Sequence, residues 1–337
     1  MIDEENQQSL PTMSPKIVVS ASRTKDLVRC RPNELADVIS GRRTCRFGLG
    51  RQLHTLKPSQ IHTLVLWTKS PQNLLENKNL HQSLKQLLIE GSQIALHISV
   101  TGFGASFVEP GIEKWSDTLA TVKELIESGM VLPDLVTLRY DPLLRLDFDD
   151  WTISNCSIEL FEAIIVQAAK LKIKRVITSA CDLDTYKRAA KRIGSVGLKA
   201  VGPNEKEAIE LVKAMAAVCH NSELLFSVCC SPKIDFDDFG CVDGKLYNKT
   251  SEGARSSEVL HNKVGSQRPR CLCTHSRDIG YSKGFTHCFS QGAGCVYCYS
   301  QGGTMGAMEK AVLSELERLR NSDRWWENAP YDYLVER

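Results

Sequence analysis

The sequence predicts an α/β fold, in which a partial (β/α) barrel is followed by a C-terminal, cysteine-rich metal module. Two observations predict the barrel: short apolar runs recur along the first two thirds of the chain, and helical patterns separate them. A third observation predicts the module, because eight of the 13 cysteines fall between residues 229 and 298.

The apolar runs are short, rich in Leu and β-branched residues, and show no clean alternation with polar residues. Strands that are buried on both faces of a parallel sheet have this pattern. The predicted strands are 16–22, 63–69, 94–102, 135–142, 175–180 and 224–230.

Amphipathic helical patterns lie between these strands, at 80–91, 118–129, 157–172 and 204–220. Gly91 and Gly129 are stop signals, and Asn204 is an N-cap residue. No Gly-x-Gly-x-x-Gly turn follows a strand, so the pattern favours a partial (β/α) barrel over a doubly wound dinucleotide-binding fold.

Four segments follow from these patterns. We predict a disordered N-terminus at 1–15, the barrel domain at 16–230, the cysteine-rich module at 231–303, and a helical C-terminal tail at 304–337. The module is rich in Gly, Ser and Cys and has no long period, which is typical of a metal site built from loops.

Composition restricts the classes of partner and the compartment. The net charge of +2 argues against a protein held on nucleic acid or on a membrane surface by bulk charge. No apolar run reaches the roughly 20 residues that span a bilayer. The polar, acidic N-terminus lacks a secretory signal, so we expect a cytoplasmic protein. In that compartment, 13 cysteines indicate metal or redox chemistry rather than disulfides.

Polar residues follow the predicted strands where a barrel carries its active site. They are Ser22 and Arg23 after the first strand, Lys69 after the second, Thr101 and Gly102 after the third, and Arg139 and Asp141 after the fourth. The three basic residues would create a positive field suited to a carboxylate or phosphate. Asp141 either holds a ribose hydroxyl or forms a structural ion pair with Arg139, and the sequence leaves both open.

The strongest candidate for a metal site is the cysteine loop near the C-terminus. Cys288, Cys295 and Cys298 lie on one loop with Gly292 and Gly294 between them, and three such thiolates can cap one iron–sulfur cluster. A cluster with three protein ligands leaves one iron open, where S-adenosylmethionine can bind through its amino and carboxylate groups. Tyr297, directly before the last cysteine, is typical of loops that bind this cofactor. The alternative is zinc, with His287 or Cys273 as the fourth ligand.

A second metal site, iron–sulfur or zinc, is a further candidate. Cys230, Cys241, Cys271 and Cys273 lie just upstream of the first set, and Cys229 competes with Cys230 for a place in it. For one of these two adjacent cysteines, a buried and inert thiol is the expected role.

Short motifs occur along the chain in one order: SASRTKD (20–26), LWTKSP (66–71), TGFG (101–104) with EP (109–110), RYDP (139–142), QRPRCLC (267–273), SRDIGY (276–281) and GCVYCY (294–299). Together they resemble the domain of unknown function 1848 family, which is regarded as radical S-adenosylmethionine-like. The resemblance implies a barrel of that type with its cluster loop at the C-terminus. It also implies a [4Fe–4S] cluster on Cys288, Cys295 and Cys298. The family usually has three residues between the first two cysteines, whereas this chain has six.

The sequence therefore predicts a radical S-adenosylmethionine enzyme that acts on an unidentified substrate. Arg23, Lys69, Arg139 and Asp141 are its candidate catalytic residues, and Ser22, Thr101, Gly102 and Tyr297 are its candidate cofactor-binding residues. A reducing partner such as flavodoxin or ferredoxin would supply electrons. The alternatives are a non-catalytic zinc-binding barrel protein and an electron carrier whose clusters are fully ligated by thiolates.

Overall fold

The computed structural model describes residues 16–48, 50–180, 187–203, 205–229, 239–251, 271–279, 288–292, 294–299, 305–321 and 334–336. The predicted N-terminal segment 1–15, Cys230 and His287 lie outside these residues. None of the helices in the described ranges is long and apolar enough to cross a bilayer.

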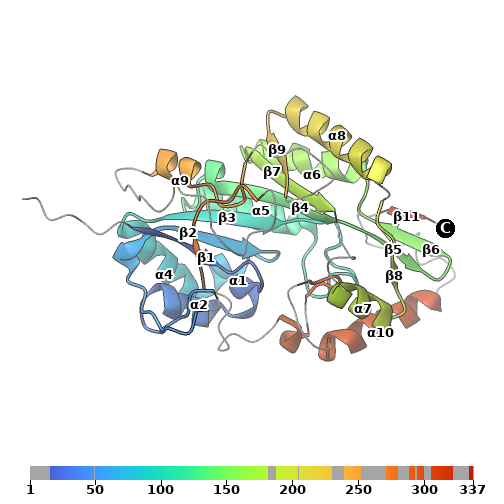
Figure 1. Ribbon diagram of the computed structural model, residues 1–337, viewed down its shortest axis with the longest axis horizontal. Helices are drawn as coiled ribbons and strands as arrows, with labels where there is room; N and C mark the ends of the chain where they lie inside the picture. The colour runs from blue at the N-terminus through green and yellow to red at the C-terminus, as the bar shows by residue number, and fades with distance from the viewer. Residues whose placement is uncertain are drawn as a thin grey trace, which may run out of the picture.

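The main sheet is parallel throughout and confirms the α/β class (Figure 1). Its strand order is β10-β1-β2-β3-β4-β7-β9. The strands are β1 (Ile17–Ala21), β2 (Ile61–Thr68), β3 (Gln93–Ser99), β4 (Val136–Leu143), β7 (Arg175–Ala180), β9 (Leu225–Val228) and β10 (Arg277–Asp278). From β1 to β9 the spatial order follows the chain order, so no reversal point of the doubly wound type occurs.

The six strands predicted from apolar runs are all present, within a few residues of their expected ends. Every residue of β2 except Trp67 is buried, and the same holds for β3 except its last residue, as two-sided coverage of a parallel sheet requires. Their carboxyl ends point to the same edge of the sheet, and the loops at that edge carry most of the candidate site.

The predicted helices are also present, as α4 (Lys78–Ile89), α5 (Trp115–Glu127), α6 (Ile158–Lys170) and α8 (Glu205–Asn221). Asn77 caps α4 by accepting from the backbone N–H of Leu80 at 2.9 Å. Ser157 caps α6 in the same way at Leu160. Both caps satisfy backbone donors that would otherwise lack a partner and fix where each helix begins.

Six further helices of the described ranges surround this framework. They are α1 (Leu27–Cys30), α2 (Pro32–Ile39), α3 (Asn73–Glu76), α7 (Lys187–Ser195), α9 (Gly244–Thr250) and α10 (Ala307–Arg320). Only α10 of them was predicted, as part of the helical tail. Phe161 of α6 packs edge-on against Tyr140 of β4, with ring centroids 5.2 Å apart, and also lies near Phe226 of β9. This aromatic row anchors α6 to the sheet.

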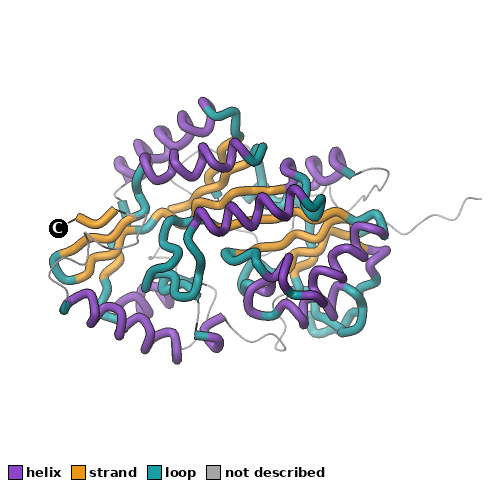
Figure 2. Tube along the Cα trace, turned by 180° about the vertical axis from the view of Figure 1, so that it is seen from behind, coloured by secondary structure: helices purple, strands orange, loops and turns teal. Residues whose placement is uncertain are grey.

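A small antiparallel sheet continues from the end of β4 (Figures 1 and 2). Its order is β11-β6-β5-β8, with β5 (Arg145–Phe148), β6 (Trp151–Ser154), β8 (Lys199–Ala200) and β11 (Leu334–Glu336). Figure 1 shows α7 and α10 beneath this sheet. The guanidinium of Arg320 on α10 makes two contacts with the Asp149 carboxylate, at 2.8 and 3.2 Å, which fasten the helix to the β5–β6 turn.

Residues from the predicted cysteine module pack against the main sheet. β10 pairs in parallel with β1, and Ile279 donates its backbone N–H to the Ser20 carbonyl at 3.0 Å. At the other end of the strands, Arg175 forms an ion pair with Asp243 at 2.7 Å. The module therefore contacts the strands of the predicted barrel directly.

Candidate functional site

The cysteine loop 288–299 is docked on the loop that follows β3, at the carboxyl edge of the main sheet. Gly294 donates its backbone N–H to the Pro110 carbonyl at 3.2 Å, and Val296 donates to the Val108 carbonyl at 3.0 Å. Val296 is fully buried, so the docked loop excludes water from this contact. The docking brings Cys295 and Cys298 to the edge where the strands end.

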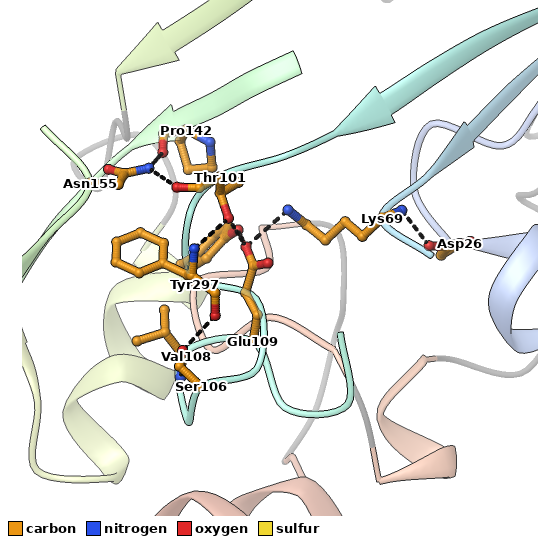
Figure 3. Close-up of polar contacts among 10 residues, drawn as sticks. Asp26, Lys69, Thr101, Ser106, Val108, Glu109, Pro142, Asn155 and Tyr297 are labelled. Atoms are coloured by element: carbon orange, nitrogen blue, oxygen red, sulfur yellow. Dashed lines mark hydrogen bonds and ion pairs between the residues drawn. The ribbon is translucent and has the colours of Figure 1, made fainter. Parts of the chain in front are cut away.

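A buried carboxylate joins the two loops (Figure 3). Glu109 is 1% exposed and accepts from Thr101 Oγ1 at 2.7 Å and from Lys69 Nζ at 3.0 Å. The hydroxyl of Tyr297 donates to the same carboxylate. Three donors on one buried carboxylate compensate its charge, which burial alone would make very unfavourable.

The network extends to the neighbouring strands. The backbone N–H of Lys69 donates to Asp26 Oδ2 at 2.9 Å, directly after β1. The amide of Asn155 donates to the carbonyls of Thr101 and Pro142, each at 2.9 Å, and so links the ends of β3 and β4 (Figure 3). The ends of four consecutive strands are therefore tied to the position of the cysteine loop.

The charges in this network fix the protonation of its members. Burial acts to lower the pKa of the Lys69 ammonium, but the Glu109 carboxylate outweighs it and the pKa is raised. Burial and the same carboxylate hold the pKa of the Tyr297 hydroxyl well above its usual range. Lys69 is therefore a cation and Tyr297 a neutral donor at physiological pH.

The three cysteine thiols of the loop influence one another electrostatically. Burial raises the pKa of Cys295 well above its usual range, Lys69 acts against this, and negative charge on Cys298 or Cys288 raises the pKa further. Three thiolates at this place would therefore require positive charge close by to remain ionised.

A basic side chain faces each of these cysteines. Burial lowers the pKa of Lys25, and a thiolate at Cys288 acts in the opposite direction. Burial likewise lowers the pKa of Arg192, opposed mainly by a thiolate at Cys298. A thiolate at Cys295 also acts to raise the pKa of Lys69, after the larger contribution of Glu109, and here the net pKa is raised. Lys25 and Arg192 were not predicted as site residues: Lys25 belongs to the SASRTKD motif but was not singled out within it, and Arg192 lies in no distinctive local pattern.

A further cysteine lies beside the loop. A hydrogen bond with Cys30, followed by burial, raises the pKa of Cys288. Cys30 is the last residue of α1, shortly after β1. It precedes Cys288 by 258 positions in the sequence. It was not predicted, because an isolated cysteine near one strand end gives no spacing signal.

As the structure stands, the described residues include no group of three His, Cys, Asp or Glu side chains that converges closely enough to hold a metal ion. The predicted ligands Cys288, Cys295 and Cys298 are brought to one region without forming such a group. His287 lies outside the described residues, so its predicted alternative role stays a prediction.

The three basic residues predicted to create a positive field are each paired with an acid. Arg139 is paired with Asp141, the structural arrangement that the sequence left open, and Ser179 also donates to Asp141. Arg23 Nε lies 3.6 Å from Asp278, and Lys69 pairs with Glu109. These pairs reduce the positive field that the sequence predicts. Asp141 is local to Arg139 in the RYDP motif, whereas Glu109 and Asp278 come from segments that no local pattern connects with Lys69 and Arg23.

The remaining candidate cofactor-binding residues lie at the same strand ends. Ser22 is buried, and its hydroxyl lies 3.2 Å from that of Thr24. Gly102 has a φ of +83°, and an added Cβ would lie 2.6 Å from Leu160 Cδ2, so both backbone and packing require glycine there. Thr101 joins the Glu109 network, whereas Ser22 and Gly102 make no described contact with it.

The second predicted cysteine set is partly assembled. Cys241, Cys271 and Cys273 line one small cavity, and Cys229 lines it with them. Cys230, the predicted member, lies outside the described residues, so Cys229 is the member of that adjacent pair that the structure brings to the cavity.

The fold and these contacts define an α/β protein with a cysteine loop docked on the carboxyl edge of a parallel sheet. The chain belongs to the family described as "Domain of unknown function (DUF1848)", whose family model matches residues 18–300. No curated protein matches the chain.

Among solved structures, the chain is similar to the carboxyl transferase domain Y628A of Rhizobium etli pyruvate carboxylase with pyruvate. The identity is 10% and the TM-score 0.22, with 64% of this chain and 41% of that chain covered. The chain thus spans about two fifths of the length of that structure, and a likeness this weak carries no argument about function.

Proposed function

We propose that this protein is a radical S-adenosylmethionine enzyme with a [4Fe–4S] cluster on Cys288, Cys295 and Cys298. The observation that carries the proposal is the docking of the cysteine loop beside the ends of β1 to β4, through Glu109 and its three donors. A substrate bound at the ends of those strands would lie next to the loop.

The parallel strand order supports a partial (β/α) barrel of the radical S-adenosylmethionine type. Six strands lie side by side in chain order, as in a barrel, with helices in the connections. In this arrangement the cysteine loop, although late in the sequence, returns to the same edge as the first strand.

The donor set fits an iron–sulfur cluster on chemical grounds. Thiolates are the usual ligands of such clusters, and thiolates at Cys288 and Cys298 would interact favourably with Lys25 and Arg192. Hydrogen bonds and charges near the sulfurs also tune the reduction potential of a cluster.

A cluster held by Cys288, Cys295 and Cys298 would supply the electron for reductive cleavage of S-adenosylmethionine, the chemistry by which enzymes of this class abstract a hydrogen atom from a substrate. The residues of the chain would bind and orient the cofactor and the substrate, and they would exclude water from the site. Lys69, held by Glu109, offers a fixed cation to a carboxylate, and Tyr297 holds the loop in place. Ser22, Thr101 and Gly102 would line the cofactor site, and Arg23, Arg139 and Asp141 the substrate side. A flavodoxin or ferredoxin would be the physiological electron donor.

The proposal is tested with anaerobically purified full-length protein. We expect about four irons and four sulfides per chain from this site, lost in Cys295→Ala and in Cys298→Ala. Dithionite and S-adenosylmethionine should then yield 5′-deoxyadenosine, detected by mass spectrometry. Cys219→Ala, which removes a buried cysteine of α8 far along the chain, is the matched control and should retain both.

Two results would overturn the proposal. Colourless protein with zinc on Cys295 and Cys298 would exclude iron chemistry at the loop. A stable cluster that never produces 5′-deoxyadenosine would instead indicate an electron carrier. The proximity of Cys30 to Cys288 favours that second candidate function, because a fourth thiolate would close the open iron.

A further inference from the structure

Four cysteines surround one cavity away from the docked loop. Cys229 follows β9, Cys241 lies before α9, and Cys271 and Cys273 precede β10. The sulfur atoms of Cys229 and Cys241 are 3.7 Å apart. The proposed function uses none of these residues.

This sulfur–sulfur distance matches thiolates on one metal ion. With zinc–sulfur bonds of about 2.3 Å, two ligands of a tetrahedral site lie roughly 3.8 Å apart. The described side chains include no three that already converge on one point, so a metal would draw Cys271 and Cys273 toward the pair. The cavity is small, which suits a single ion better than a larger cluster.

The backbone explains why the two cysteine segments lie so close. An added Cβ at Gly240 would lie 2.4 Å from the Leu272 carbonyl oxygen and 2.7 Å from the Cys273 nitrogen, so only glycine permits this approach. The backbone N–H of Val242 donates to Cys273 Sγ at 3.4 Å, and Thr274 donates to the Val242 carbonyl at 2.9 Å. A backbone N–H directed at sulfur is a contact that stabilises a thiolate.

Two arginines, of which Arg139 is buried and Arg23 half-buried, contact the same cysteines. Arg139 Nη1 donates to Cys241 Sγ at 3.1 Å, and Arg23 Nη1 lies 3.8 Å from Cys273 Sγ. A divalent ion on four thiolates has a net charge of about −2, and the two arginines, which each also pair with an aspartate, would offset only part of it.

We propose that Cys229, Cys241, Cys271 and Cys273 bind a second thiophilic metal centre, separate from the cysteine loop 288–299. The four thiols lose their protons on binding, and no electron is transferred. The centre joins the end of β9 to the segments before α9 and β10. The Cys229–Cys241 sulfur distance and the small cavity favour one zinc ion, and an iron–sulfur cluster on the same thiolates is the other form that the experiment distinguishes.

The test is the metal and sulfide content of full-length protein, measured for wild type, Cys241→Ser and Cys271→Ser. We expect about one zinc per chain in wild type and near none in the two variants. Loss of iron and sulfide instead would support the same site with a cluster. Cys219→Ser is the control and should retain all metals. Unchanged metal content in both site variants would overturn the proposal.

A second measurement tests the proposed centre in the wild-type protein, so that its outcome does not depend on whether the Cys241 and Cys271 variants fold. Wild-type protein stripped by a chelator is titrated anaerobically with Co²⁺, which gives a coloured complex with thiolates. One equivalent should bind, also in a Cys295→Ala/Cys298→Ala variant that lacks the proposed cluster loop. Failure of both proteins to bind Co²⁺ would overturn the second centre while leaving the proposed function open. If the Cys295→Ala/Cys298→Ala variant loses iron but still binds Co²⁺, the result concerns only the cysteine loop 288–299.

Discussion

The ammonium of Lys69 lies 3.0 Å from Oε1 of Glu109, and the two side chains are 15% and 1% exposed. This ion pair connects the end of β2 with the loop on which the cysteine segment is docked. Because both groups are shielded from water, each depends on the other for charge compensation. The pair is therefore a buried structural element of the site and not an exposed ion pair on the surface of the protein.

Replacing one partner of this pair should be costly. Glu109→Gln keeps the shape but leaves the Lys69 ammonium without a carboxylate, and we expect the free energy of unfolding to fall by about 3 kcal/mol. The double variant Lys69→Met/Glu109→Gln should lose less free energy of unfolding than the two single variants lose in sum. Urea unfolding of the three variants measures this coupling.

An exposed pair in the same chain provides the control. Lys123 and Glu127 lie on α5, 3.6 Å apart and about 60% exposed. Lys123→Gln should change the free energy of unfolding by less than about 1 kcal/mol. Equal effects of Glu109→Gln and Lys123→Gln would contradict the role of the buried pair.

The pH dependence of stability should report on His97. Its ring stacks on Trp67 with centroids 4.1 Å apart, and Nδ1 has no hydrogen-bond partner within the described residues. Burial lowers the pKa of His97 to about 3 from an ordinary value of 6.5. The charged groups that face it are Cys241, which acts to raise the pKa, and Arg139, Arg175 and Arg23, which lower it.

Below pH 6.5 the unfolded chain binds a proton at His97 that the folded chain excludes down to about pH 3. This contribution to stability is therefore complete above pH 6.5 and is lost as the pH falls, by about 1.4 kcal/mol per unit. His97→Phe keeps the stacking, so between pH 7 and 5.5 the free energy of unfolding should fall by about 1 kcal/mol less than in wild type. His220→Gln, at an exposed end of α8, should follow wild type. Parallel curves for His97→Phe and wild type would refute a buried neutral histidine.

Local patterns predicted the framework well because buried parallel strands and amphipathic helices are encoded within short windows. They failed for the small sheet, since β8 has only two residues and β11 pairs with β6 from a distant part of the chain. They also did not connect Glu109 and Asp278 with the basic residues that pair with them. Tyr297 and Glu109 are 188 positions apart, and no periodicity connects them.

The cysteines show the same limit. The glycine-rich spacing identified the loop 288–298 and the cysteines before β10, since ligands on one loop leave a local signal. Cys30 and Cys229 meet these groups only through the fold. Sequence spacing therefore points to cysteines that share one loop and misses the cysteines that only the fold brings next to them.

Gly294 should be required for the shape of the cysteine loop. Its φ is +147°, and an added Cβ would lie 2.9 Å from the Phe289 ring and 3.3 Å from Met308 Sδ. Gly294→Ala should therefore destabilise the protein by about 2–4 kcal/mol through strain and overpacking. Under the proposed function it should also lower the iron bound per chain.

Gly292 is the matched control on the same loop. Its φ is +70° but nothing lies within 4 Å of an added Cβ. Gly292→Ala should cost only the backbone strain of about 1 kcal/mol and retain iron. Similar losses of stability and iron in the two variants would mean that the packing of Gly294 against Phe289 is unimportant.

Cys30 and Cys288 compete for one position in the proposed cluster. Their thiols are hydrogen-bonded, and the spacing of six residues between Cys288 and Cys295 departs from the family pattern. If Cys288 is the ligand, Cys288→Ser should lose the iron bound by this loop and Cys30→Ser should retain it. We expect this result because Cys288 shares one loop with Cys295 and Cys298, and the docking of that loop places all three cysteines together. Iron and sulfide analysis of anaerobic protein measures the outcome. The reverse pattern would assign Cys30 as the third ligand, and loss in both variants, without 5′-deoxyadenosine formation by wild type, would indicate a closed cluster of four thiolates.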